Sequence, residues 1–212
     1  MCRKRKRIGI MGGTFDPIHL GHLILGETAY EQFELDEVLF MPAGNPPHKR
    51  VRPNRATDEQ RVEMVRRAIR TNPHFSLCLK EMESDGITYT YKTLESLKEE
   101  NPDTDYFFIL GADSLFDFDT WKEPKRICNT CTILVATRDH TEGEKLDETM
   151  SALRERYQGD FRKMYSLNID VSSKLLRSWI RQDRTLKYYV PDDVIAYIGE
   201  NRIYKGCTTD EL

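Results

Sequence analysis

Two histidines, His19 and His22, stand three residues apart, shortly after the double glycine Gly12–Gly13. The short apolar run before the glycines predicts a strand, and the segment after them predicts the start of a helix. A turn from strand to helix presents backbone N–H groups and the positive end of the helix dipole, which together favour an anion such as phosphate. Histidines at this spacing share one helix face, so their N–H groups can donate to the same anion.

This loop differs from the usual glycine-rich phosphate loops. Its glycines fall at positions 9, 12 and 13, so neither Gly-x-Gly-x-x-Gly nor Gly-x-x-x-x-Gly-Lys-Ser/Thr is present. A zinc site is one alternative for the histidines, but zinc-binding helices prefer a spacing of about four residues with a nearby glutamate, and the sequence offers no evident third ligand. Two unrelated surface histidines are the other alternative. The position after a strand and a double glycine favours anion binding.

Short apolar runs alternate with longer amphipathic stretches along the chain, and these elements must position the loop. Runs such as "YFFIL" and "TILVA" are apolar or nearly so, as is typical of strands buried on both faces of a parallel sheet. The alternation predicts an α/β fold with a Rossmann-like, doubly wound, mostly parallel sheet and a helical C-terminal section. We expect strands at 7–11, 37–42, 75–80, 106–111, 132–136 and 163–168.

The stretches between these strands predict helices at 20–33, 57–70, 90–100 and 146–157. The sequence Thr57-Asp58-Glu59-Gln60 is a capping box that marks the start of the second. A helix starting at Ser172 or Ser173 and another beginning around Pro191 complete the pattern. In open α/β sheets the ligand lies at the carboxyl ends of the strands, which directs attention to segments 12–22, 43–50 and 111–121 and to the start of the 172 helix.

Length and charge narrow the class of protein. With 212 residues and a formal net charge of -3, the chain predicts a single domain over 1–212, with about 172–212 as its helical section. This charge balance gives no reason to expect a nucleic-acid partner. The basic run at 3–7 is soon followed by Gly12–Gly13, which interrupts the apolar stretch that a signal peptide needs, so we expect no signal peptide. No apolar window approaches the length of a membrane span, so we expect none.

The chain has five cysteines, an odd and irregularly spaced set that fits reduced thiols in a cytoplasmic protein better than a disulfide framework. Cys128 and Cys131 have the spacing of a zinc or redox pair. No second pair exists, and Cys131 leads into an apolar run, so structural thiols are the favoured interpretation. The oligomeric state, a homo-oligomer included, is left open by the sequence.

The segment Gly13-Thr14-Phe15-Asp16-Pro17-Ile18-His19-Leu20-Gly21-His22 matches G-x-F-x-P-x-H-x-G-H at every fixed position. It resembles the nucleotidyltransferase signature of the small adenylyl- and cytidylyltransferases. Residues 171–177 resemble the second signature of these enzymes, I-S-S-T-x-I-R. Here Val171, Lys174 and Leu176 replace the first Ile, the Thr and the second Ile, while both serines and the arginine are retained.

Three more segments resemble the bacterial nicotinate-nucleotide adenylyltransferases, over about 7–204 of the chain. They are Pro46-Pro47-His48-Lys49, the "TYTYKTL" at 88–94, and Gly111-Ala112-Asp113-Ser114 with Trp121. The resemblance implies transfer of the adenylyl group of ATP to nicotinate mononucleotide in NAD biosynthesis, with magnesium. The alternatives are pantetheine-phosphate adenylyltransferases and cytidylyltransferases, which usually lack "TYTYKTL" and "GADS…W", and a regulatory nucleotide-binding module without turnover.

This chemistry requires donors and cations more than an activated nucleophile. The acceptor's phosphate oxygen is already anionic, so the protein has to align two polyanions and stabilise charge as pyrophosphate leaves. Magnesium shares that work and needs few protein ligands. Arg177, one turn into its helix, can bind phosphate in bidentate fashion, whereas Trp121 can stack on the pyridine ring. Residue types alone do not fix a preference for acid or amide acceptors.

The site residues expected on these grounds fall into three overlapping sets. As catalytic residues we expect His19, His22, Lys49 and Arg177. For ATP we expect Gly12, Gly13, Thr14, Phe15, His19, His22, Gly111, Asp113, Ser172, Ser173 and Arg177. For nicotinate mononucleotide we expect Thr14, His48, Lys49, Thr88, Tyr89, Thr90, Trp121 and Arg138.

Overall fold

The computed structural model describes residues 5–44, 55–84, 86–137, 143–167 and 169–205. Within these residues six parallel strands form one sheet, in the order β3-β2-β1-β4-β5-β6. The sequence predicts a doubly wound sheet without fixing its strand order, and this order is a doubly wound one with its switch point between β1 and β4. The strands are β1 (Lys6–Gly13), β2 (Glu37–Pro42), β3 (Phe75–Leu77), β4 (Thr104–Gly111), β5 (Thr132–Thr137) and β6 (Phe161–Tyr165).

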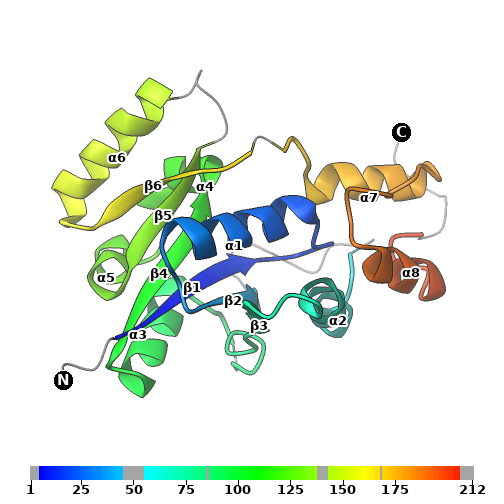
Figure 1. Ribbon diagram of the computed structural model, residues 1–212, viewed down its shortest axis with the longest axis horizontal. Coiled ribbons are helices and arrows are strands. Elements are labelled where there is room, and N and C mark those ends of the chain that lie inside the picture. Colours follow the sequence, from blue (N-terminus) through cyan, green and yellow to red (C-terminus); the bar gives the residue numbers. More distant parts are fainter. Residues whose placement is uncertain (1–4, 45–54, 85, 138–142, 168, 206–212) are drawn as a thin grey trace.

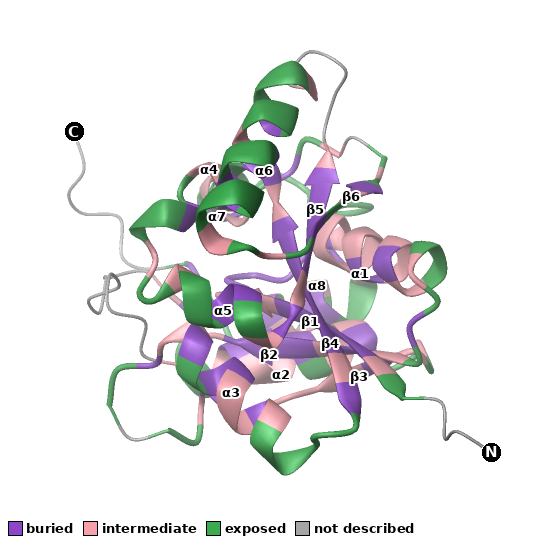
Figure 2. Ribbon diagram, turned by 90° about the vertical axis from the view of Figure 1, so that its left-hand side faces the viewer, coloured by how far each residue is buried: buried purple, intermediate pink, exposed green. Residues whose placement is uncertain are grey.

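Helices cover both faces of the sheet and bury its apolar strands (Figures 1 and 2). Successive strand residues point to opposite faces, so in β4 Phe107 and Phe108 belong to two different core clusters. The first cluster includes residues of α1 (Leu20–Gln32), α2 (Asp58–Ile69), α7 (Ser173–Arg181) and α8 (Asp192–Glu200). The second includes residues of α3 (Thr90–Glu100), α4 (Ala112–Phe116), η1 (Phe118–Thr120), α5 (Pro124–Thr130) and α6 (Gly143–Tyr157).

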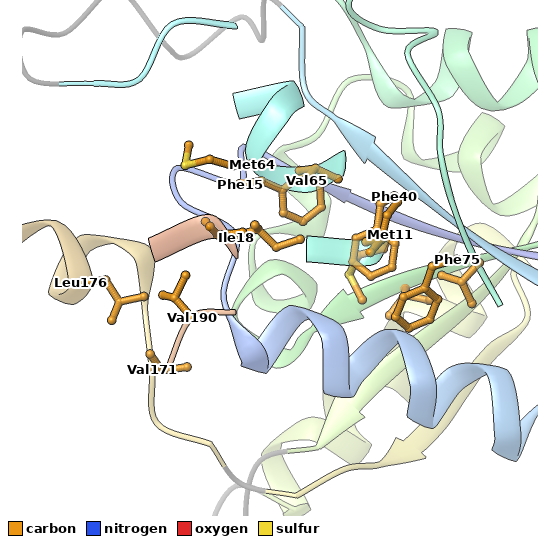
Figure 3. Packing of buried hydrophobic residues seen from close by; sticks show 14 of the residues in the cluster. Met11, Phe15, Ile18, Phe40, Met64, Val65, Phe75, Val171, Leu176 and Val190 are labelled. Carbon is orange, nitrogen blue, oxygen red and sulfur yellow. The ribbon is translucent and has the colours of Figure 1, made fainter. Parts of the chain in front are cut away.

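The C-terminal helices share the first core cluster instead of forming one of their own. Leu176 and Val190 are buried with Phe15, Phe40 and Met64 from the N-terminal half (Figure 3). Each such side chain contributes about 1.5–3 kcal/mol when fully buried. This packing places α7 and α8 at the end of the sheet toward which β1 points (Figure 1), so the start of α7 lies beside the loop that follows β1.

The bounds of most elements agree with the sequence prediction, and the exceptions are local. β3 ends at Leu77 and not at 80, because the chain turns at Leu79, whose carbonyl accepts from the Met82 N–H at 2.8 Å. β6 spans Phe161–Tyr165 and not 163–168. Helices α4 and α5 were not predicted, because with 5 and 7 residues they are too short for helical periodicity to stand out. The predicted capping box is present, with Thr57 and Gln60 bonded reciprocally.

Within the part of the chain that the structure describes, no helix is long and apolar enough to cross a bilayer.

Candidate functional site

The loop after β1 lies between two clefts at the carboxyl ends of the strands. At the later end of this loop, His19, together with Gly21 and His22 of α1, lines a cleft of about 240 Å³ that the start of α7 also borders. At its earlier end, Gly12 to Thr14 line a second cleft of about 360 Å³ with residues of β2, β4 and the start of α3. The segment from the end of β1 to the start of α1 therefore lines two separate clefts.

The two histidines of the first cleft form a stacked pair at the start of α1. Their ring centroids are 3.8 Å apart with an interplanar angle of 28°. The His19 backbone N–H donates to His22 Nδ1 at 3.3 Å. Because Nδ1 accepts, the neutral His22 ring carries its proton on Nε2, which is then a donor. The predicted pairing of the imidazoles is confirmed, and their role toward a ligand stays a prediction.

The buried side chain of Phe15 anchors the loop in the hydrophobic core. Its backbone lies in the left-handed region with φ of 50°, and its side chain is only 1% exposed. The ring contacts His22 edge-on, with centroids 5.0 Å apart, and also packs near Phe40. A Cβ on Gly13 would meet the Phe15 ring at 3.0 Å. The Phe15 side chain therefore belongs to the core, so any contact of this residue with ATP would come from its backbone.

The serines at the start of α7 are already engaged within the protein. The Ser172 hydroxyl accepts from the Leu175 N–H at 3.2 Å as an N-cap. The Ser173 hydroxyl donates to the Pro17 carbonyl at 2.9 Å. Both residues line the first cleft. These bonds fix the helix N-terminus against the histidine loop, where its free N–H groups favour an anion.

Arg177 of α7 is not among the residues that line this cleft, and its guanidinium contacts Asp16. Its Nη1 donates to the Asp16 carbonyl and lies 3.6 Å from the Asp16 carboxylate. Asp16 is 1% exposed and also accepts from Arg55 and from the Tyr204 hydroxyl, both at 2.7 Å. Burial lowers the pKa of Arg177 from its ordinary value. The predicted bidentate binding of phosphate would require this guanidinium to leave its contacts with Asp16 in the loop.

The second cleft has an aromatic and hydroxyl-bearing wall. Trp121 is half-buried, and its ring packs near Phe118 and Phe108, with centroids 5.5 Å and 6.1 Å away. Thr88, Tyr89 and Thr90, at the start of α3, line the same cleft. With Thr14, the structure thus brings together in one cleft five residues that were expected to bind the pyridine nucleotide.

Other predicted residues lie elsewhere. Gly111 ends β4 and caps α4, and the exposed Asp113 lies in the first turn of α4 beside Ser114, which lines the second cleft. Asp113 thus lies two residues after the end of β4, where a contact with ribose was expected, and that contact stays a prediction. His48, Lys49 and Arg138 lie outside the described residues.

Two buried charged residues at the second cleft were not predicted from the sequence: Glu81 lines the cleft, and Arg61 contacts two residues of its lining. Arg61 of α2 is 4% exposed and Glu81 is 8% exposed. Arg61 follows Asp58 at the spacing of an ordinary surface ion pair, and Glu81 falls in a segment that was assigned to no element. Burial raises the pKa of Glu81. Their burial, which indicates a special role, is visible only in the folded chain.

The cysteine pair has the character of core residues. Burial raises the pKa of Cys128 to about 11, and it raises that of Cys131 as well. Among the described residues, no cluster of three or more His, Cys, Asp or Glu side chains could hold a metal ion. The observed environment agrees with structural thiols.

The cytidylyltransferase-like family model matches residues 10–188, which defines the class of this protein. A relative from Lachnoclostridium phytofermentans is described as a probable nicotinate-nucleotide adenylyltransferase. It is 36% identical over 199 residues, covering 94% of this chain and 99% of the relative. A relative of the same description from Thermoanaerobacter is 39% identical over 201 residues, covering 94% of each. The chain therefore belongs to the nicotinate-nucleotide adenylyltransferase family.

The fold is also similar to that of a solved Plasmodium falciparum enzyme, nicotinic acid mononucleotide adenylyltransferase. In its complex with NaAD that structure has a TM-score of 0.74 and 21% identity, covering 94% of this chain and 97% of the other. In its complex with APC the TM-score is 0.72. At this identity the likeness supports the fold alone.

Proposed function

We propose that this protein transfers the adenylyl group of ATP to nicotinate mononucleotide, producing deamido-NAD and pyrophosphate. The observation that carries the proposal is the pair of clefts on either side of one loop, with stacked imidazoles in one and an aromatic and hydroxyl-bearing wall in the other. Family membership, with relatives named for this reaction, supports the same activity.

In this proposal the first cleft binds ATP and the second binds the acceptor. An acceptor phosphate oxygen attacks the α-phosphorus of ATP, forming a new P–O bond, while the bond from that phosphorus to the pyrophosphate oxygen breaks. No proton has to move, because the attacking oxygen is already anionic. His22 Nε2 and the N–H groups at the starts of α1 and α7 stabilise negative charge on the triphosphate.

ATP would enter as its magnesium complex. At nucleotide sites Mg²⁺ usually needs only one or two protein carboxylates besides substrate phosphates and water. Magnesium supplies charge neutralisation on the triphosphate. The residues of the protein then position this complex through the loop and the two helix N-termini.

The acceptor's pyridine ring would stack on Trp121, and its carboxylate would accept hydrogen bonds from Thr88 and from backbone N–H groups at the start of α3.

We propose that the enzyme acts in the cytoplasm. Its described cysteines Cys78, Cys128 and Cys131 are free thiols, as expected of a protein in a reducing compartment. Whether the enzyme acts as a homo-oligomer is tested by its mass in solution.

Pyrophosphate release tests the activity. Purified protein with magnesium and ATP should release pyrophosphate with nicotinate mononucleotide and more slowly with nicotinamide mononucleotide or phosphopantetheine. His22→Ala should lower kcat by about 10²–10³-fold, the usual cost of removing one donor to a developing charge. Release with none of the three acceptors would refute the proposal.

His74 provides the matched control. Its ring stacks on Tyr30, with centroids 3.8 Å apart, and bonds to Glu27, and it lies outside the linings of both clefts. His74→Gln should keep the wild-type kcat. An equal loss of rate in both variants would show that removal of any half-buried histidine disturbs the fold, and would leave His22 without a specific role.

A further inference from the structure

Arg61 is a cation buried next to the second cleft but not part of its lining. It lies one turn into α2, and its side chain is 5% exposed. Its Nη1 donates to the Thr14 carbonyl and its Nη2 to the Ala43 carbonyl, both at 2.8 Å. The third partner is Asp58, at 2.6 Å, whose side chain is 58% exposed. A fourth and weaker contact joins Nη2 to Met82 Sδ at 3.9 Å. Two of the four contacts are therefore made to backbone carbonyls.

Those two carbonyls belong to the ends of neighbouring strands. Thr14 follows β1 and Ala43 follows β2, and the register pairs Gly13 with Pro42 immediately before them. Both Thr14 and Ala43 line the second cleft. The guanidinium of Arg61 thus spans the gap between the two loops whose separation sets one wall of that cleft.

The Ala43–Gly44 segment is held from its other side as well. The Ala43 N–H donates to the Gly13 carbonyl at 2.7 Å, and the Gly44 N–H donates to the buried Glu81 carboxylate at 3.4 Å. Glu81 also accepts from the Thr93 hydroxyl of α3 at 3.3 Å. A Cβ on Gly44 would lie 2.0 Å from the Glu81 carbonyl oxygen. The segment is therefore fixed between a cation and a carboxylate.

We propose that Arg61 is a positioning residue for the acceptor, which acts through the Thr14 and Ala43 carbonyls to hold the second cleft open at the width of a pyridine mononucleotide. This inference rests on the proposed function, which assigns that cleft to the acceptor. A buried cation is costly, and well-packed apolar side chains stabilise a core at least as well. The planar fork of arginine reaches two carbonyls at once, which the single ammonium of lysine does not.

The test separates acceptor binding from ATP binding. Arg61→Lys keeps the charge and most of the volume but loses the fork. It should raise KM for nicotinate mononucleotide about tenfold, equivalent to about 1.4 kcal/mol, while KM for ATP stays within about twofold of wild type. Arg61→Met, which also loses the charge, should raise the acceptor KM further, again with little change for ATP.

Asp58→Asn is the matched control, since it weakens the exposed contact of the same guanidinium and leaves both carbonyl contacts in place. Its acceptor KM should match wild type. Urea unfolding of every variant shows whether each remains folded under the assay conditions. A parallel rise of both KM values, or an unchanged acceptor KM in Arg61→Lys, would overturn the inference. Turnover of the wild-type protein is measured separately. If the proposed function is wrong, the wild-type protein is inactive with these substrates. If only the role of Arg61 is wrong, the wild-type protein is active and the KM values of the variants differ from those expected.

Discussion

The hydroxyl of Tyr204 offers a direct measure of how strongly the C-terminal segment supports the site loop. Tyr204 is 4% exposed, and its hydroxyl donates to Asp16 Oδ1 at 2.7 Å. Tyr204→Phe deletes this bond and leaves the ring in place. Hydrogen bonds to charged groups contribute about 1.5–3 kcal/mol. Asp16 keeps its bonds to Arg55 and to the Ala56 N–H, so its carboxylate is not left unpaired, and we expect a loss of about 2 kcal/mol.

Urea and thermal unfolding measure this loss. For a protein of this size about 1 kcal/mol shifts Tm by 2–4 °C, so Tyr204→Phe should lower Tm by roughly 4–8 °C. The urea m value should not change, because both proteins bury the same surface. Tyr188 is 81% exposed, and Tyr188→Phe should stay within about 0.5 kcal/mol of wild type. Equal stability of Tyr204→Phe and wild type would refute the assigned bond.

Alkaline pH tests the same bond independently. Burial first, and then the Asp16 charge, raises the pKa of Tyr204 above its ordinary value. The folded state therefore keeps the proton when the unfolded chain, with a tyrosine pKa of about 10, loses it. The stabilisation from this group is complete below about pH 10 and falls as the pH rises beyond it. Wild type should lose stability more steeply above that pH than Tyr204→Phe, and equal slopes would contradict the buried environment.

Two further predictions concern packing and the thiols. Gly44→Ala should lower the free energy of unfolding in urea by about 3 kcal/mol or more, because its Cβ would lie 2.0 Å from the Glu81 carbonyl oxygen. Gly199→Ala, with open space around its Cβ, should cause no loss. Unchanged stability of Gly44→Ala would show that the segments of Gly44 and Glu81 lie further apart. At neutral pH a thiol reagent followed by peptide mapping should leave Cys128 and Cys131 unlabelled until urea is added, because their raised pKa values keep the thiols neutral, and rapid labelling of the folded protein would contradict their burial.

Much of the fold follows from the sequence because its signals are local. The apolar run of β5 predicts a strand with both faces buried, and the Thr57 capping box predicts the start of α2 within one residue. The histidine loop was recognisable because its strand, glycines and histidines are contiguous in the chain. Short α4 and α5 were missed for the opposite reason, since 5 and 7 residues hold too little periodicity.

The sequence by itself determined the class of sheet and the closeness of the two imidazoles. Only the tertiary structure decided which charged side chains are buried and which distant groups they bind. Asp16 is 161 residues from Arg177 and 188 from Tyr204, and Arg61 reaches carbonyls 47 and 18 residues away. Residue type and local spacing give the same pattern for a solvated arginine and a buried one. The difference lies in desolvation and in distant hydrogen-bond partners, which exist only when the chain has folded.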